Sequence, residues 1–578
     1  MSIFVPVLLA GALASAAWVS DVPVANSSDT AAPPRGDINY VSGVSSTVPG
    51  LGSYLIGAVA DLGGMPDVAL KGYMGALADD PDSLELRQRT FELSLMSGDM
   101  GNAVRLARTL PEVNQTTMSN LVRMADDAHS GKIDKARKVA REITKTSPDL
   151  LQFRLMQAYL DYAHGSRVPQ LVAWIDSLDL PSSMAGRKYY HEARLWLKAG
   201  EPEKALVALK KAHAAEPGAV GSTILLGQTL ARQGQPDAAA AVYDTFRAEN
   251  PAIALLVPEG KDILANQPPA FASTVDEDLS ATLADFGLLV WAQGAIAPAR
   301  QVLNLTLWLN PDDIYTRYYL GLLLEMGGDL PAAAANYDVL AHGNVPEGVR
   351  IAAEIRLAEV AYRGGDKETP WQTLSKLAEE HPDVIGLQRS VAQMAFNRGE
   401  FDKAASSYSN MIDHLPAQTP AEAKAELLFA RGAAYERGGN PKAATTDLQA
   451  ALALMPAEPQ VLNYLGYMWI EQGTHIQEAF EMLQKAHLLA PQDGAVTDSL
   501  GWAYYKQGDY ATAMTYLEHA VEQEPESAEI FDHLGDAYAK LGRKDDARLA
   551  WQRALDLVAA GKDAPDAGFA KAVKKKLR

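Results

Sequence analysis

Apolar residues recur at intervals of three and four along most of the chain, and short turns interrupt them regularly. This spacing places the apolar side chains on one face of an α-helix. Between 494 and 557 the pattern occurs twice, the second time 34 residues after the first. Each copy predicts two helices joined at a glycine turn, Gly508-Asp509 and Gly542-Arg543. The chain is therefore predicted to consist of repeated helix pairs.

The two copies share small residues where helices must approach each other. The matched pairs are Leu500 and Leu534, Gly501 and Gly535, Tyr504 and Tyr538, Ala513 and Ala547, Leu517 and Trp551, and Ala520 and Ala554. Because Gly501 and Ala513 have almost no side chain, they are expected at close helix contacts. Tyr504 and Leu517 then supply the buried area, and Pro525 ends its helix because it lacks an amide hydrogen.

This pattern resembles the tetratricopeptide repeat (TPR) family, whose unit has a Leu-Gly pair, an aromatic residue, two spaced alanines and a closing proline. The resemblance implies an all-α superhelical solenoid of about 12 to 14 helix-turn-helix repeats. It also implies a concave groove that binds a segment of a partner protein. The chain further resembles exported TPR proteins of Gram-negative bacteria, which implies a role in the cell envelope.

The pattern divides the chain into six parts. We predict a signal peptide or N-terminal anchor at 1–20, a flexible linker at 21–50, a partly degenerate N-terminal TPR array at 51–251, an irregular insertion or hinge at 252–279, a C-terminal TPR array at 280–557 and a basic capping tail at 558–578. Pro268-Pro269 forbids a continuous helix through the insertion. A hinge and an eroded repeat both stay open for it.

Two details of the arrays follow from spacing. Gly466 and Gly501 are 35 residues apart whereas Ala479 and Ala513 are 34 apart, so the turn at 473–476 is predicted to hold one extra residue. In a solenoid, each repeat is expected to touch only its neighbours.

The N-terminal segment predicts export. Residues 1–20 carry no charge and contain Ala14-Ser15-Ala16, which suits signal peptidase. No Lys or Arg precedes the apolar stretch, however, so the usual positive region is missing. A cleaved signal, a retained anchor and an ordinary terminus stay open. The predicted location is the periplasm or envelope, with a cytoplasmic or inner-membrane-anchored protein as the alternative.

Composition and motifs argue against several function classes. The net charge of −20 opposes binding to nucleic acid, and the absence of cysteine excludes disulfides and thiolate metal sites. The pair His191-Glu192 is not completed to a zinc-binding HExxH motif, and no phosphate-binding glycine loop occurs. We therefore predict a scaffold that is not an enzyme and needs no cofactor or metal. The alternatives are a cytosolic or tethered adaptor and a glycan- or peptidoglycan-active protein with two carboxylates in the groove.

The predicted partner site lies on the first helices of the last three repeats. Its residues are Asn463, Tyr467, Asp498, Trp502, Tyr505, Lys506, Asp532, Asp536 and Lys540. Since the three aspartates would repel an anion, the expected partner is a protein segment with basic and apolar residues, anchored by Trp502. In the alternative, Trp502 and Tyr467 pack between adjacent repeats. Membrane association through the N-terminus or the basic tail also stays open.

Overall fold

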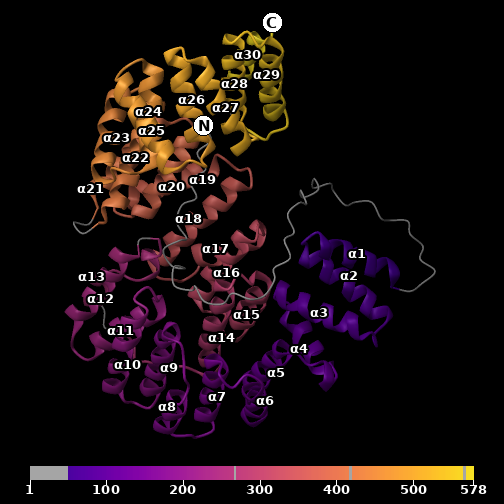
Figure 1. Cartoon of the computed structure of the whole chain (residues 1–578). Coiled ribbons are helices and arrows are strands. Elements are labelled where there is room, and N and C mark those ends of the chain that lie inside the picture. The colour runs from indigo at the N-terminus through magenta and orange to yellow at the C-terminus, as the bar shows by residue number, and fades with distance from the viewer. Residues whose placement is uncertain (1–49, 251, 266–267, 416–418, 564–567) are drawn as a thin grey trace. The chain divides into compact units, whose positions relative to one another are not determined.

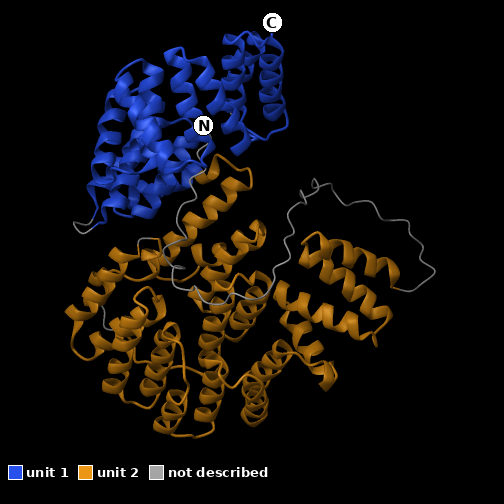
Figure 2. Cartoon of the chain, viewed as in Figure 1, with its two compact units in different colours: residues 1–7, 371–578 blue, residues 8–370 orange. Residues whose placement is uncertain are grey.

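A computed structural model of the chain describes residues 50–250, 252–265, 268–415, 419–563 and 568–578. The predicted leader at 1–20 and, apart from Gly50, the linker at 21–50 lie outside these residues. The described residues form α-helices and three short 3-10 helices, without any strand (Figure 1). They divide into two compact units, of which unit 2 is described over 50–370 and unit 1 over 371–578 (Figure 2).

The helices of unit 2 follow one another as antiparallel pairs over most of its length. They are α1 (Leu51–Leu62), α2 (Pro66–Asp79), α3 (Leu84–Ser97), α4 (Met100–Thr109), η1 (Glu112–Asn114), α5 (Thr117–His129), α6 (Ile133–Thr146), α7 (Leu151–Ala163), α8 (Val168–Asp176), η2 (Ser182–Met184), α9 (Ala185–Lys198), α10 (Pro202–Ala215), α11 (Val220–Arg232), α12 (Pro236–Glu249), η3 (Ala254–Leu256), α13 (Gly260–Ala265), α14 (Val275–Ala292), α15 (Ile296–Leu309), α16 (Ile314–Met326), α17 (Leu330–Ala341) and α18 (Glu347–Arg363).

Unit 1 continues the same pattern and ends in one short additional helix. Its helices are α19 (Thr369–Glu380), α20 (Ile385–Asn397), α21 (Phe401–Asp413), α22 (Ala421–Arg437), α23 (Pro441–Leu454), α24 (Pro459–Gln472), α25 (Ile476–Leu489), α26 (Gly494–Gln507), α27 (Tyr510–Gln523), α28 (Ala528–Lys540), α29 (Lys544–Ala559) and α30 (Phe569–Lys576). No helix in the described ranges is long and apolar enough to cross a membrane.

The small residues of the repeated pattern lie where the sequence predicts close contacts. A Cβ atom on Gly501 would lie 3.0 Å from Cγ of Leu517, which is closer than ordinary contact, so a larger residue would require Leu517 to move. Ala513 and Ala520 of α27 are fully buried. Between these helices Gly508 has φ 88°, a left-handed conformation that glycine adopts without steric cost. The predicted helix-pair architecture is confirmed.

The extra residue predicted at 473–476 is also present. The link between α24 and α25 has three residues, whereas that between α26 and α27 has two. His475 takes φ 48°, which is unusual for a residue other than glycine. Its ring stacks on Trp469 at 4.4 Å, and its Nδ1 lies 2.6 Å from Glu478. These contacts hold the lengthened turn in place.

Unit 2 contradicts the expectation that each repeat touches only its neighbours. Its helices turn back so that α15 packs on α3 while α14 packs on α5 and α7 (Figure 1). One buried cluster joins Leu121 and Phe153 of the early helices to Leu279 and Leu305 of the later ones. The rings of Phe153 and Phe286 meet edge to face at 5.6 Å. Early and late helices of unit 2 therefore share one buried cluster, in addition to the contacts between neighbouring pairs.

Side chains of α15 cap the end of α3. The last carbonyls of a helix have no partner within the helix. Here Asn304 donates from Nδ2 to the carbonyls of Leu95 and Met96 at 2.8 and 3.0 Å, and Arg300 donates from Nε to Met96 at 2.6 Å. Gln301 donates to a carbonyl one turn earlier. These contacts from a distant helix add to the local cap of α3, in which the backbone N–H of Gly98 donates to the carbonyl of Leu95.

The region predicted as an insertion or hinge contains η3, α13 and the start of α14. Arg247 donates to the carbonyls of Ala254 and Val257 at 3.0 and 2.9 Å, and Val257 is fully buried. The helix α14 begins inside the predicted boundary because Thr274 and Glu277 form a capping box. Hinge motion in this region stays a prediction.

Candidate functional site

The predicted partner-binding residues lie on α24, α26 and α28, which pack side by side in unit 1. The hydroxyl of Tyr467 on α24 donates to the carboxylate of Glu529 on α28 over 3.5 Å, past the intervening α26. Side chains from three successive helix pairs therefore meet on one surface, which we call the C-terminal surface. It comprises the nine predicted residues together with Glu471, Glu529 and His533, which the sequence analysis did not identify.

Asp498 is buried in this surface and paired. Its two carboxylate oxygens each lie 3.0 Å from Nδ1 of His533, which is also buried. Burial is the largest single effect and disfavours the charged imidazole, but Asp498 together with Glu529 and Asp532 more than offsets it and raises the pKa of His533 to about 9. The pair thus forms an internal ion pair between α26 and α28. Asp498 is not the open carboxylate that the sequence suggested.

Trp502 is held between two other rings. Its indole stacks on Tyr505 at 4.5 Å and on His533 at 4.0 Å, with interplanar angles of 5° and 16°. The indole Nε1 donates to Glu471 at 2.6 Å, and Lys506 lies 3.0 Å from the same carboxylate. Both faces of the ring are covered, so no face is available to a partner in this conformation. Anchoring by Trp502 stays a prediction, and it requires the stack to open.

The other two aspartates contact the end of the chain. Nζ of Lys576 in α30 lies 2.8 Å from both oxygens of Asp532 and 2.8 Å from Asp536. Burial raises the pKa of Asp532, and the lysine opposes this shift. Val573 of α30 is fully buried in a cluster with Trp551 of α29. A basic helix of the chain itself therefore occupies this part of the surface.

The remaining predicted residues differ in exposure. Lys506 and Lys540 are exposed, and Tyr505 is half-buried, with a pKa that burial raises to about 12. Asn463 is buried, and Nζ of Lys540 lies 5.8 Å from the ring centre of Tyr510. Lys506, Lys540 and Glu471 are thus the exposed residues of the surface, while Tyr505 is half-buried like Tyr467, Glu529, Asp532 and Asp536.

Sequence reasoning did not identify a cleft in unit 2. This cleft of about 710 Å³ lies between the first helices and α15–α16, where the unit closes on itself. Its apolar lining includes Met65, Phe91, Met96, Met118 and Ile296. Methionine side chains adapt easily to the shape of a bound group. Since the lining residues, from Asp61 to Asp329, are up to 268 positions apart in sequence, no local pattern could reveal the cleft.

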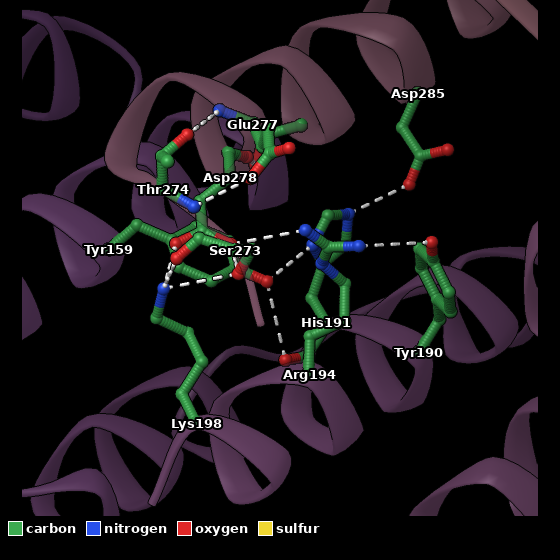
Figure 3. Close-up of polar contacts among 11 residues, drawn as sticks. Tyr159, Tyr190, His191, Arg194, Lys198, Ser273, Thr274, Glu277, Asp278 and Asp285 are labelled. Carbon is green, nitrogen blue, oxygen red and sulfur yellow. Dashed lines mark hydrogen bonds and ion pairs between the residues drawn. The ribbon is translucent and has the colours of Figure 1, made fainter. Parts of the chain in front are cut away.

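A buried polar network connects α7 and α9 with α14, one of the helices that turn back onto the early part of unit 2 (Figure 3). His191 hydrogen-bonds with Tyr159 through Nδ1 and with Asp285 through Nε2, each at 2.9 Å. Arg194 and Lys198 both contact Asp278, at 3.0 and 2.6 Å. Because His191 and Asp278 are shielded from solvent, the network is suited to holding these helices together.

One pair of carboxyl groups in unit 2, Asp176 and Glu192, is relevant to the alternative prediction of a glycan-active protein. Burial and the nearby Asp176 raise the pKa of Glu192 to about 7. Lys188 lies 2.7 Å from Asp176 and 3.7 Å from Glu192, which is buried. A general acid must reach its substrate, and Glu192 is enclosed. The described residues also contain no group of three side chains that could hold a metal ion.

The sequence matches two family models, both described as tetratricopeptide repeat. One covers residues 387–560 and the other residues 197–256. The first includes all three helices of the C-terminal surface. No curated protein matches the chain.

Several solved structures are similar to the chain. The Cut9–Hcn1 hetero-tetramer of the APC/C is 15% identical over 80% of this chain and 97% of its own, with a TM-score of 0.36. A tetratricopeptide repeat protein from Parabacteroides merdae is 17% identical over 46% and 97%, with a TM-score of 0.39. YrrB, described as a TPR protein with an unusual peptide-binding site, is 21% identical over 35% and 97%, with a TM-score of 0.25. The family models thus identify tetratricopeptide repeats at residues 197–256 and 387–560.

Proposed function

We propose that the chain is a non-catalytic scaffold of the bacterial cell envelope that binds a protein segment at the C-terminal surface. TPR repeats serve as protein–protein interaction modules. The observation that carries the proposal is the link from Tyr467 to Glu529, which brings three successive repeats into one surface. A segment that contacts several repeats gains affinity from each of them.

The proposed partner segment contains basic and apolar residues. Apolar side chains suit the half-buried ring of Tyr505, and basic groups suit the carboxylate of Glu471. Lys576 supports the second point, because its ammonium group lies 2.8 Å from both Asp532 and Asp536. The overall charge of −20 further favours a cationic partner.

A site-specific cross-link tests where the partner binds. A photo-reactive amino acid in place of Lys540 should capture one protein from the cell envelope, identified by mass spectrometry. The same group in place of Lys544, an exposed residue at the start of α29, is the matched control. Equal capture at both positions would contradict binding at the C-terminal surface.

Calorimetry with the captured partner tests whether its bound segment is basic and apolar. Tyr505→Ala should weaken binding roughly tenfold, as expected for an aromatic contact, while Lys540→Ala should strengthen binding by removing a repelling charge. Leu488→Ala on α25, an exposed apolar residue outside the surface, should change nothing. Tighter binding at higher salt would refute a basic segment. Trp502 and Asp498 are poor positions for this test because both are buried.

Export is tested separately, since it depends on residues 1–20. A tagged chain should occur in the envelope fraction, with a mature N-terminus after the apolar segment. A soluble cytosolic product that begins at Met1 would refute export and leave the binding proposal intact.

A further inference from the structure

The outer face of α1 is the largest concentration of exposed apolar side chains in the described ranges. Eight of the nineteen large apolar residues that are exposed there lie between Leu51 and Val68. Leu51, Leu55, Val59 and Leu62 are spaced by three or four residues and therefore form one ridge along the helix. Ile56 lies beside them. We call these five residues the α1 ridge.

The opposite face of α1 packs on α2, the second helix of the same pair. A Cβ atom on Gly72 would lie 2.4 Å from the backbone nitrogen of Gly57, so the backbones of α1 and α2 are in direct contact. Ala60 and Ala69 are buried at the same interface. The α1 ridge points away from this interface, and α2 cannot cover it.

The same positions are covered in a repeat that has a predecessor. Gly57 corresponds to Gly501, so Ile56 and Val59 correspond to Leu500 and Ala503 of α26. Ile56 and Val59 are 45% and 60% exposed, whereas Leu500 and Ala503 are 2% and 0% exposed. In α26 the helices α24 and α25 of the preceding pair pack on this side. The α1 ridge therefore has the form of a surface that receives helices.

Charges around the ridge indicate what kind of helix fits. The exposed carboxylates between 51 and 92 are Asp67, Asp79, Asp80, Asp82 and Glu85, against one exposed base, Lys71. Asp79 lies beside the start of α1, since a Cβ on Gly50 would be 3.1 Å from its Cβ. Asp67 follows the turn at the other end. Acidic groups therefore flank both ends of the ridge.

These charges favour one occupant over three others. A second copy would bring the same carboxylates together, and an anionic lipid surface would be repelled as well. Residues 1–49 of the chain carry three aspartates and one arginine, so their side chains have no net positive charge to compensate these carboxylates. We infer that the α1 ridge docks a helix of another protein whose apolar face is flanked by Lys and Arg. This surface lies in unit 2 and is independent of the C-terminal surface.

Binding of designed peptides to the full chain tests the inference. The probe is a fluorescein-labelled 18-residue helical peptide of Leu and Lys with the leucines on one face. Its binding is measured by fluorescence anisotropy. Leu55→Ser with Val59→Ser should weaken its binding at least tenfold. The matched control is Leu488→Ser with Leu549→Ser, which removes two exposed leucines elsewhere and should change nothing. Thermal unfolding confirms that both variants fold, because all four side chains are exposed.

Two further peptides separate a shaped site from general attraction to an acidic protein. A peptide of the same composition with scattered leucines should bind at least tenfold more weakly, and so should a Leu and Glu helix. Equal binding of the scattered peptide would overturn the inference.

Three other results would also overturn it. The first is a concentration-dependent dimer that the Leu55→Ser, Val59→Ser variant abolishes. The second is peptide binding only after deletion of residues 1–49. The third is binding to vesicles of phosphatidylglycerol and phosphatidylethanolamine through the ridge while the Leu and Lys helix does not bind.

Discussion

Trp551 fills the space next to Gly535, where a Cβ atom would lie 2.5 Å from Cδ1 and Nε1 of the indole. The indole also donates a hydrogen bond to Asp536 at 3.1 Å. Trp551→Ala should therefore cost about 3 to 5 kcal/mol of stability through the cavity that it leaves. Hydrogen exchange should show α28–α30 losing protection before the rest of unit 1.

Leu549 of the same helix provides the control for this change. It is exposed, so Leu549→Ala should alter the stability by less than about 0.5 kcal/mol. Simultaneous loss of protection throughout unit 1 in the Trp551→Ala variant would show that its repeats do not unfold separately.

The ion pair of His533 and Asp498 should make stability depend on pH. The pKa of His533 in the folded protein, about 9, lies above its value of about 6.5 in an unfolded chain. The folded state therefore binds the proton more tightly. This stabilisation is complete below about pH 6.5 and is lost as the pH rises through 9. Urea unfolding across this range should show the decline.

Replacement of the histidine isolates this effect. His533→Gln should remove most of the decline between pH 6.5 and 9, whereas His519→Gln, at an exposed position of α27, should leave it in place. Besides Asp498, the nearby Glu529 and Asp532 also favour the charged imidazole. An unchanged pH profile in His533→Gln would assign the decline to another group.

The contact between α3 and α15 predicts a long-range effect of one amide side chain. Asn304→Ala should cost roughly 1 to 2 kcal/mol, because it removes the two hydrogen bonds that Nδ2 donates from α15 to the carbonyls of Leu95 and Met96. Hydrogen exchange should increase in α3 as well as in α15. Asn336→Ala is the control, since Asn336 donates only within its own helix, to Ala332. A change confined to α15 would contradict the capping role.

Asp278 should be one of the most sensitive positions in unit 2. Asp278→Asn would leave the buried Arg194 and the nearby Lys198 without their anion, at a cost of about 3 to 5 kcal/mol. Asp276→Asn, two residues earlier and more exposed, should cost far less. Equal unfolding midpoints in urea for the two variants would show that the network contributes little to stability.

The helix pairs could be predicted because the residues that define them are close in sequence. Gly501 and Leu517 are 16 positions apart, and the same spacing separates Gly535 from Trp551 and Gly321 from Tyr337. The lengthened turn at His475 was predictable for the same reason. Small residues and turn glycines leave a local pattern whose physical cause is steric.

The details of the C-terminal surface could not be predicted in this way. Trp502 follows the motif glycine and looks accessible on a single helix, but His533 of the next repeat covers one of its faces. Lys576 reaches Asp532 from a helix that does not belong to any repeat. The closure of unit 2 joins α3 to α15, and no period in the sequence links residues that far apart.

The hydrogen bond from Arg300 to Met96 joins residues that are 204 positions apart. At synthesis rates of about 5 to 20 residues per second, a ribosome needs roughly 10 to 40 seconds to advance from one to the other. Until then α3 emerges without the helix that completes it, and its apolar side chains stay accessible to chaperones. The early part of unit 2 therefore depends on the order in which the chain is made, and a pause in translation before Arg300 would prolong its exposure.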